Sequence, residues 1–395
     1  MISRRGFTRA GIAGAALGLG VPPFRSAAAA AELPTSSDAY RPWRDWRPDV
    51  PLVHSAILAA NAHDTQPWQF CSTPDRIDLL ADESRNLGAM DPFRREMHIS
   101  LGCALENLAL AARAQGLAAD IAMEPGVVTP NASDKKLRHA ARVMLSKVAP
   151  EITPLFEAIP RRHTNRGSYD RDRPVSADTL DTLRRQVGAD DTVRLILLVE
   201  DAQRRDFATA TIAATQAIIA DKEMIGDSDS WFRGSDAEID KHRDGPTIYA
   251  AGLSPFREFM AGILPAPSAD QNHDYWLGLT RDTQLATGSV FGLIAVRDLY
   301  DRPQSMRAGR LWQRLHLQGT LLGLGMQPLN QLPEMVDRER QTGKPAGTAN
   351  TLANLVGDAD WHPTFAFRLG WPVRPAPASP RRTLESVTTT DGCPA

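Results

Sequence analysis

One helix that the sequence predicts is apolar on most of its sides. We expect it to begin at Asp91-Pro92, with Asp as the N-cap and Pro in the first helical position, and to end at Gln115, before Gly116. Its apolar residues, among them Ile99 and Leu105, are spread too broadly for a single stripe. A helix with this pattern is usually buried. We therefore expect it to be the central helix of a folded unit.

Part of this helix recurs later in the chain. Segment 106–110 precedes Gly116-Leu117 much as segment 313–317 precedes Gly323-Leu324, and the offset between the glycines is 207 residues (323 − 116). Leucine-rich helices that end in Gly are common, so this repeat alone decides little. It agrees with a chain built from two similar halves.

The composition is that of a globular protein. The 395 residues are enough for one large or two ordinary domains, and 42% are hydrophobic and 23% charged. A net charge of −2 favours neither nucleic acid nor an anionic membrane as a partner. The three cysteines suggest no disulfide framework and no metal spacing, and we expect Cys71 and Cys103 to be small buried hydrophobes, with Cys393 in the tail. We expect no metal site.

Residues 1–31 have the pattern of an export signal. Ser3-Arg4-Arg5-Gly6-Phe7 matches the twin-arginine pattern S-R-R-x-F, and a mild apolar run and an alanine-rich cleavage region follow it. The run is too short and too weakly apolar for a stable spanning helix. We expect a twin-arginine signal peptide, the twin-arginine export machinery as a partner, and a periplasmic or other extracytoplasmic location without stable membrane insertion. The alternative is a chance arginine pair in a general secretory signal.

The remaining chain divides into a linker and two halves. We expect a linker over 32–51, a first half over 52–160, and a second half over 161–395 with an irregular insertion at 223–281 and a proline-rich tail that wraps the other half. The patterns predict further helices over 52–61, 151–158, 176–186, 202–222 and 304–324, and strands over 68–71, 76–80, 118–123, 141–147, 193–199, 289–296 and 364–369.

A basic segment opens the second half. Arg162, Thr164 and Arg166 occupy every second position, so an extended strand would point them to one side. Two guanidiniums and a hydroxyl on one side suit a phosphate group, which accepts charge-assisted hydrogen bonds. The alternative is a basic turn on the surface.

A second segment, residues 61–70, contains Thr65-Gln66-Pro67-Trp68. The two segments together resemble the nitroreductase family of FMN enzymes, in which an R-x-S-x-K/R segment grips the FMN phosphate and an N-x-Q-P-W segment lies against the flavin. The order of the segments is reversed here, which resembles the fused single-chain (Acg-type) branch. The resemblance implies an α+β, nitroreductase-like fold of two fused half-domains, each with a mixed sheet, that form a pseudo-dimer with one FMN site at their junction.

The resemblance also implies which residues bind the cofactor. The phosphate would be held by Arg162, Thr164, Arg166, Arg381 and Arg382, the pyrimidine edge by Asp64, Thr65, Gln66 and Pro67, and the N5 and O4 side by Leu329, Asn330 and Gln331. Asp64 departs from the family, where Asn is usual; facing the flavin, it would repel an anionic reduced ring. If Asp64 turns outward, Asn61 or His63 would serve instead. The alternatives are a solvated tail pair for the two C-terminal arginines and an ordinary helix-exit loop for residues 329–331.

The function implied is an exported FMN oxidoreductase of nitroreductase type. It would transfer a hydride through flavin N5 to a nitroaromatic or quinone-like acceptor, with no catalytic acid or base from the protein. The small-molecule electron donor stays open because NAD(P)H is scarce outside the cytoplasm. The alternatives are a protein that sequesters flavin with little turnover and a flavin-free binding module. The insertion 223–281 is either a lid or structural, and the chain is either a monomer (an internal pseudo-dimer) or a homodimer.

Overall fold

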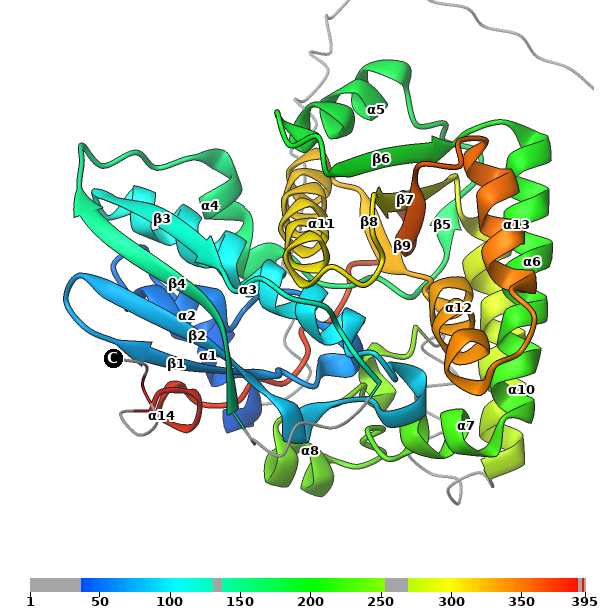
Figure 1. Ribbon diagram of the computed structural model, residues 1–395, viewed down its shortest axis with the longest axis horizontal. Coiled ribbons are helices and arrows are strands. Elements are labelled where there is room, and N and C mark those ends of the chain that lie inside the picture. Colours follow the sequence, from blue (N-terminus) through cyan, green and yellow to red (C-terminus); the bar gives the residue numbers. More distant parts are fainter. Residues whose placement is uncertain (1–36, 131–136, 253–268, 390–392, 394–395) are drawn as a thin grey trace, which may run out of the picture.

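The computed structural model describes residues 37–130, 137–252, 269–389 and 393. Residues 1–31, for which we predict a signal peptide, lie outside this range, as does part of the insertion. The architecture combines two sheets with long helices, so the α+β class predicted from the sequence is confirmed (Figure 1). No helix among the described residues is both long enough and apolar enough to cross a membrane.

The first sheet contains four strands in the order β1-β2-β4-β3. These are β1 (Trp68–Ser72), β2 (Arg76–Asp82), β4 (Leu137–Lys147) and β3 (Leu117–Met123), and every neighbouring pair is antiparallel. The predicted hairpin is confirmed by β1 and β2, in which Phe70 pairs with Leu79. The long helix α3 (Arg95–Ala114) packs against this sheet, and α2 (Leu52–Ala56) packs against α3.

The second sheet has the order β5-β9-β7-β6, with β8 also paired to β9. Its strands are β5 (Tyr169–Asp170), β9 (His362–Pro372), β7 (Val290–Val296), β6 (Val193–Leu198) and β8 (Gly325–Pro328). All their pairings are antiparallel, so the expectation of a mixed sheet is wrong. Helix α11 (Arg302–Leu322) lies on one side, and α6 (Asp201–Ala220), α12 (Gln331–Thr342) and α13 (Gly347–Val356) lie on the other (Figure 1).

The central strand β7 is buried on both faces. Val290 and Ile294 belong to the apolar cluster that includes α3 and α11, whereas Phe291 and Leu293 belong to the cluster beneath α6 and α12. This division follows the alternation of side chains along a strand. It explains why β7 is uniformly apolar.

The two long helices α3 and α11 cross with almost no space between their backbones. A Cβ on Gly102 would overlap the carbonyl of Met306, and a Cβ on Gly309 would overlap the carbonyl of Ile99. Both correspondences have the offset 207 (309 − 102 and 306 − 99), which is the offset of the sequence repeat. The crossing is therefore reciprocal, as it is in a symmetric dimer of equal subunits.

The smaller helices around the halves are α1 (Arg41–Arg44), α4 (Pro154–Ala158) and α5 (Ala177–Arg184). Ser176 caps α5 by accepting a hydrogen bond from the Thr179 N–H, so the predicted start is confirmed. The predicted start of α3 is wrong by several residues. Arg94 adopts a left-handed conformation, and the Asp91 carboxylate accepts from the N–H groups of Glu96 and Met97 from outside the helix.

The insertion is more regular than predicted. Its described part contains α7 (Lys222–Asp229), α8 (Asp236–His242) and α10 (Ala269–Leu279), followed by a π-helical segment, Thr280–Leu285. Ser235 and Asp221 cap two of these helices, which are short polar elements without a strong apolar period. Segment 253–268, which falls within the insertion expected to be either a lid or structural, lies outside the described residues.

The C-terminal tail wraps onto the first half, as predicted. The N–H of Arg381 donates to the carbonyl of Ala39 at 2.7 Å, and the N–H of Thr389 donates to the carbonyl of Phe70 at 2.9 Å. One short helix, α14 (Leu384–Val387), interrupts the otherwise irregular tail.

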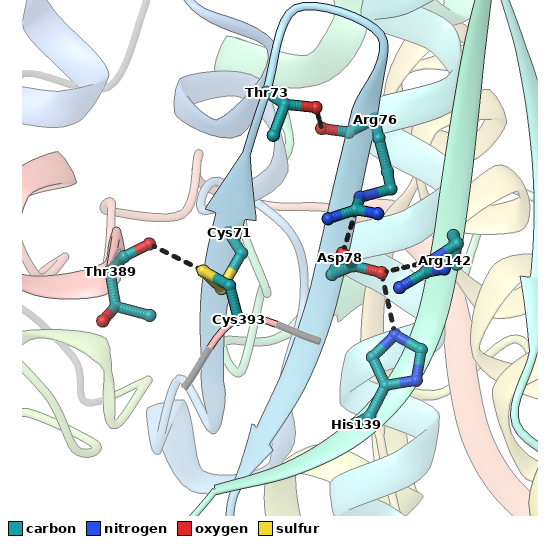
Figure 2. Close-up of a disulfide and its surroundings, with 8 residues drawn as sticks. All are labelled: Cys71, Thr73, Arg76, Asp78, His139, Arg142, Thr389 and Cys393. Carbon is teal, nitrogen blue, oxygen red and sulfur yellow. Dashed lines mark hydrogen bonds and ion pairs between the residues drawn. A yellow bond between two sulfur atoms is a disulfide. The ribbon is translucent and has the colours of Figure 1, made fainter. Parts of the chain in front are cut away.

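A disulfide joins Cys71 of β1 to Cys393 of the tail, 322 residues apart (Figure 2). The expectation that Cys71 is an unpaired buried hydrophobe is therefore wrong, because the returning tail brings its partner to it. Cys103 is free and buried, as expected.

Candidate functional site

Arg162 is a buried arginine at the junction of the halves. It follows the short turn Ile159–Arg161 in an extended conformation and is 2% exposed. Its guanidinium donates to Nδ1 of His316 at 3.3 Å and to the carbonyl of Leu58 at 3.2 Å, and its Nε has no hydrogen-bond partner. Burial, and then the nearby Arg381, lower the pKa of Arg162 to about 9. The folded protein therefore holds this cation at an energetic cost.

Arg381 reaches the same region from the tail. Its Nη1 donates to Oδ1 of Asp64 at 2.6 Å, and its Nη2 donates to the carbonyl of Ala59 at 3.1 Å. The Nε of Arg381 has no hydrogen-bond partner, nor does Oδ2 of Asp64. The tail and the first half thus form one buried ion pair beside Arg162.

Arg166 is the third cation of this region. It is half-buried, and its Nη1 donates to the carbonyl of Ala250 at 3.3 Å. Burial lowers its pKa, and the charge of Asp64 opposes that shift. Thr164, between the two motif arginines, is half-buried. We call Arg162, Arg166 and Arg381 the arginine cluster.

The histidines of this region do not add positive charge at neutral pH. Burial, and then Arg162, lower the pKa of His163 to about 3, while burial and Arg166 lower that of His63 to about 4. His316 accepts from Arg162 through Nδ1 and donates from Nε2 to the carbonyl of His163 at 3.3 Å, so it is the neutral Nε2–H form.

The arginine cluster carries more positive charge than its surroundings compensate. Asp64 forms an ion pair with Arg381, but within the described ranges neither Arg162 nor Arg166 has a carboxylate within ion-pair distance. Unpaired buried charge is costly. An anion with several acceptor oxygens, such as a phosphate, would satisfy the unpartnered Nε atoms and balance the charge. The phosphate end of an FMN site fits these residues.

One residue of this region is not among the predicted site residues. Trp43, in the segment expected to be a linker, meets the ring of His163 edge-on with ring centroids 4.7 Å apart, and its ring centroid lies 4.8 Å from the Arg381 guanidinium carbon. Its indole N–H donates to the carbonyl of Ser379, in the tail. The only available signal was the clustering of Trp and Arg in residues 41–47.

The pyrimidine-side residues are engaged by the protein itself. Gln66 is fully buried; its Nε2 donates to the carbonyl of Arg243 at 2.8 Å, and its Oε1 accepts from the N–H of Arg382 at 2.8 Å. Thr65 is 2% exposed and its carbonyl accepts from Arg85, while Pro67 is buried just before β1. Trp68 lies in the core, as predicted. The side chain of Gln66 thus links the insertion to the tail, and its contact with the flavin edge stays a prediction.

Arg382 differs from Arg381. Its guanidinium donates to the carbonyls of Gln66 at 3.2 Å and Ser386 at 2.8 Å, which fixes the tail rather than presenting a free donor. Burial and the neighbouring Arg85 lower its pKa to about 10. A phosphate contact by Arg382 stays a prediction.

The predicted N5-side segment is not an exit loop. It spans the end of β8 and the start of α12, and the N–H of Leu329 already donates to the carbonyl of Ala366 at 2.8 Å. Oδ1 of Asn330 accepts from the N–H of Ala366 at 2.8 Å. Strand pairing thus satisfies the backbone donor expected near N5. Gln331, 5% exposed, retains an Oε1 without a hydrogen-bond partner.

The insertion packs over the Asp64 segment. The N–H of Gly245 donates to the carbonyl of Asp64 at 3.2 Å, and Asp244 pairs with both Arg85 and Arg233. A polar cavity of about 460 Å³ lies beside these residues, lined also by Trp231 and His242. The described part of the insertion is therefore at least a structural support for residues 61–66.

No family model matches the chain. It is 26% identical over 355 residues to a Mycobacterium tuberculosis protein provisionally named an NAD(P)H nitroreductase, covering 86% of this chain and 92% of that protein. An uncharacterized protein of the same species is 25% identical over 352 residues, covering 85% and 92%. The resemblance to nitroreductases expected from the two motifs is confirmed by the first of these relatives.

Solved structures with some structural likeness include two FMN-dependent nitroreductases. The Mycobacterium smegmatis enzyme NfnB, in complex with NADPH, shares 14% identity with a TM-score of 0.38, covering 60% of this chain and 99% of its own. NfnB from a Sphingopyxis strain shares 18% identity, also with a TM-score of 0.38 and coverages of 60% and 99%. At these scores the likeness carries no functional weight.

Proposed function

We propose that this chain is an exported flavoprotein of nitroreductase type that holds one FMN at the junction of its halves. The observation that carries the proposal is the arginine cluster. Arg162 is buried and Arg166 half-buried, and neither has a carboxylate partner among the described residues, at the positions where the motif predicts a phosphate. The name of the mycobacterial relative supports the same class.

Four residues at the phosphate end of the site would have distinct roles. Arg162 and Arg166 would bind the phosphate from the second half, and Arg381 would bind it from the tail. Trp43 covers Arg381 and His163 and would keep water from the charged contacts, which strengthens them. When bound, FMN supplies two-electron hydride chemistry to a nitroaromatic or quinone-like acceptor.

Flavin sequestration with little turnover is the second candidate function. One observation favours it: of the side chains predicted to face the ring, Gln66 has both its amide groups hydrogen-bonded within the protein, and Oδ1 of Asn330 already accepts from a backbone N–H. A cofactor held mainly through its phosphate would stay bound, although the protein would not position its flavin ring for a substrate. Steady-state reduction of a nitroaromatic or a quinone by NAD(P)H separates the two functions.

Export is part of the proposal. The twin-arginine pattern at Arg4-Arg5 motivates it, and the Cys71–Cys393 disulfide supports it because such bonds persist in oxidising compartments. Fusion of the chain to a reporter that is active only outside the cytoplasm tests this point. Replacement of both arginines by lysine should abolish the signal.

The test of the cofactor site is the flavin content of purified protein. Released chromophore, identified by mass, should be FMN at about one per chain. The double variant Arg162→Ala/Arg166→Ala should fold and contain no FMN, because it removes two of the three phosphate-binding cations. The control is Arg161→Ala/Arg171→Ala, which removes two exposed arginines from the same segment. Unchanged flavin in the first double variant, or no flavin in the parent after incubation with FMN, would refute the assignment.

A further inference from the structure

Asp64 is the one carboxylate in contact with the arginine cluster among the described residues. Its Oδ1 accepts from Nη1 of Arg381 at 2.6 Å and from Nδ2 of Asn61 at 3.1 Å, whereas its Oδ2 accepts no hydrogen bond. The residue is 9% exposed. One of its two oxygens thus neutralises Arg381, and the other is buried without a partner.

The backbone around Asp64 is held in a conformation that L-residues rarely adopt. His63, Asp64 and Gln66 have φ values of 44°, 50° and 50°. Such conformations are unfavourable and persist only where the surroundings fix them. Here the fixing contacts are the Gln66 amide, bound to residues of the insertion and the tail, and the N–H of Gly245, bound to the carbonyl of Asp64. The insertion and the tail therefore hold the Asp64 carboxylate against Arg381.

The ion pair and a phosphate would compete for the same cation. Arg381 has one ion-pair partner, Asp64, and a phosphate in the arginine cluster would lie beside the Asp64 carboxylate. Two buried anions that share one set of cations repel each other, and each weakens the binding of the other. Asp64 acts on Arg162 and Arg166 through its charge as well.

We propose that Asp64 is the internal counter-ion of the arginine cluster, occupying Arg381 when no ligand is bound and thereby limiting the affinity of the cluster for a phosphate monoester. The inference rests on the proposed function for the identity of the ligand as FMN. The shared chemistry is the phosphate group, which FMN and inorganic phosphate both carry and riboflavin lacks.

The experiment compares Asp64→Asn with the parent protein in the flavin-free form. Dissociation constants are measured for FMN, riboflavin and inorganic phosphate. We expect Asp64→Asn to bind FMN and inorganic phosphate about ten-fold more tightly, which corresponds to the loss of about 1.4 kcal/mol of repulsion, and to bind riboflavin with unchanged affinity. In the absence of a ligand, the variant should melt at a lower temperature because Arg381 loses its partner, and phosphate should restore the melting temperature.

The matched control is Asp78→Asn. Asp78 is a fully buried carboxylate of β2 that binds Arg142 at 2.7 Å and His139 at 3.0 Å, away from the arginine cluster (Figure 2). This variant should also melt lower, but phosphate should not restore it. If Asp64→Asn does not fold, Asp64→Ser is measured with the same expectation, and folding of either variant only in the presence of phosphate supports the inference.

The outcomes separate the inference from the proposed function. Weaker FMN binding by Asp64→Asn would show that the carboxylate positions Arg381, and equal changes for FMN and riboflavin would place Asp64 at the ring; both overturn the counter-ion role. Unchanged binding of FMN and inorganic phosphate also overturns it. A parent protein that binds inorganic phosphate but no FMN overturns the proposed function alone.

Discussion

Buried carboxylates outside the arginine cluster form the opposite kind of site. Asp91, Glu96, Glu334 and Asp337 are all buried around a single cation, Arg95, whose guanidinium pairs with Asp337 at 2.8 Å. Burial, and then Glu334, raise the pKa of Glu96, and burial raises the pKa of Glu334 to about 8. At neutral pH the folded protein therefore keeps part of this group protonated.

Replacing Glu334 tests this charge distribution. Its pKa is higher in the folded chain than its ordinary value of 4.5, so its contribution to stability is present below pH 4.5 and is lost as the pH rises towards 8. Glu334→Gln cannot ionise. The unfolding free energy of the variant should therefore rise relative to the parent between pH 4.5 and 8, by on the order of 1 kcal/mol per pH unit.

Urea unfolding at a series of pH values measures the effect. The control is Glu157→Gln, an exposed glutamate of α4, which should leave the pH dependence unchanged. Parallel stability curves for Glu334→Gln and the parent would show that Glu334 is ionised in the folded protein.

Among the individual site residues, the sequence could predict only those that lie in one local segment. Arg162, Thr164 and Arg166 are recognisable because their spacing lies within one segment. The contact of Arg381 with Asp64 spans 317 residues and depends on where the tail returns, which no local pattern specifies. The neighbours of Gln66 match a motif that predicts a flavin contact, whereas the hydrogen bonds by which its buried amide joins the tail to the insertion appear in no local pattern.

At the scale of elements, the crossing of α3 and α11 determines how the halves meet. Gly102 and Gly309 allow the two backbones to touch, and next to them Nε2 of Gln313 donates to Oδ1 of Asn107 at 2.8 Å inside the interface. Close backbone contact needs residues without a Cβ. The close crossing of α3 and α11 therefore depends on one glycine in each half, Gly102 and Gly309.

Gly102→Ala should strongly destabilise the protein. The new methyl group would overlap the backbone of Met306, which cannot move without shifting α11, so we expect a cost of about 3 kcal/mol in the free energy of unfolding. The control is Gly278→Ala in α10, where no atom lies near the new Cβ and helix propensity should give a gain of about 0.5 to 1 kcal/mol.

The second glycine extends this test. Gly309→Ala should lower the free energy of unfolding about as much as Gly102→Ala. The double variant should lower it by less than the sum of the two, because once one methyl group has pushed the helices apart, there is room for the second. Denaturant unfolding of the three variants gives these values. Additive costs would mean that the two contacts are independent.

The elements differ in how well the sequence predicts them. The β1–β2 hairpin and strands β3, β4, β6 and β7 follow from apolar patterns and turn residues, and they agree with the structure within a few residues. The short strands β5 and β8 exist because β9 offers them hydrogen-bond partners, which a local pattern does not contain. The helices of the insertion have weak apolar periodicity, and their caps, such as Ser235, become informative only once a helix is known to follow.

At the scale of the whole molecule, the tail connects the two halves. It leaves β9 in the second half, delivers Arg381 to the arginine cluster, and continues along β1, where residues Phe70 and Thr388 form a parallel bridge. The Cys71–Cys393 disulfide fixes its end (Figure 2). The disulfide and Arg381, for which we propose a phosphate contact, thus lie on the same C-terminal segment.

Loss of the disulfide should therefore weaken both stability and cofactor retention. Cys71→Ser/Cys393→Ser removes a link that closes a very long loop, and we expect the free energy of unfolding to fall by about 2 to 4 kcal/mol. Release of the tail end should also free Arg381 more often, so bound FMN should dissociate several-fold faster. Thermal unfolding measures the change in stability. The rate at which flavin passes to an excess of another flavoprotein, prepared without its flavin, measures the change in retention.

Dithiothreitol provides the internal control. It should lower the melting temperature of the parent to that of the double serine variant and leave the variant unchanged, because Cys103 is already a free thiol. Faster flavin release without a change in melting temperature would mean that the disulfide holds the tail in place but does not stabilise the fold. If dithiothreitol and the double substitution change neither quantity, the contacts of Arg382, Val387 and Thr389 hold the tail without help, and its position is fixed by packing rather than by the covalent bond.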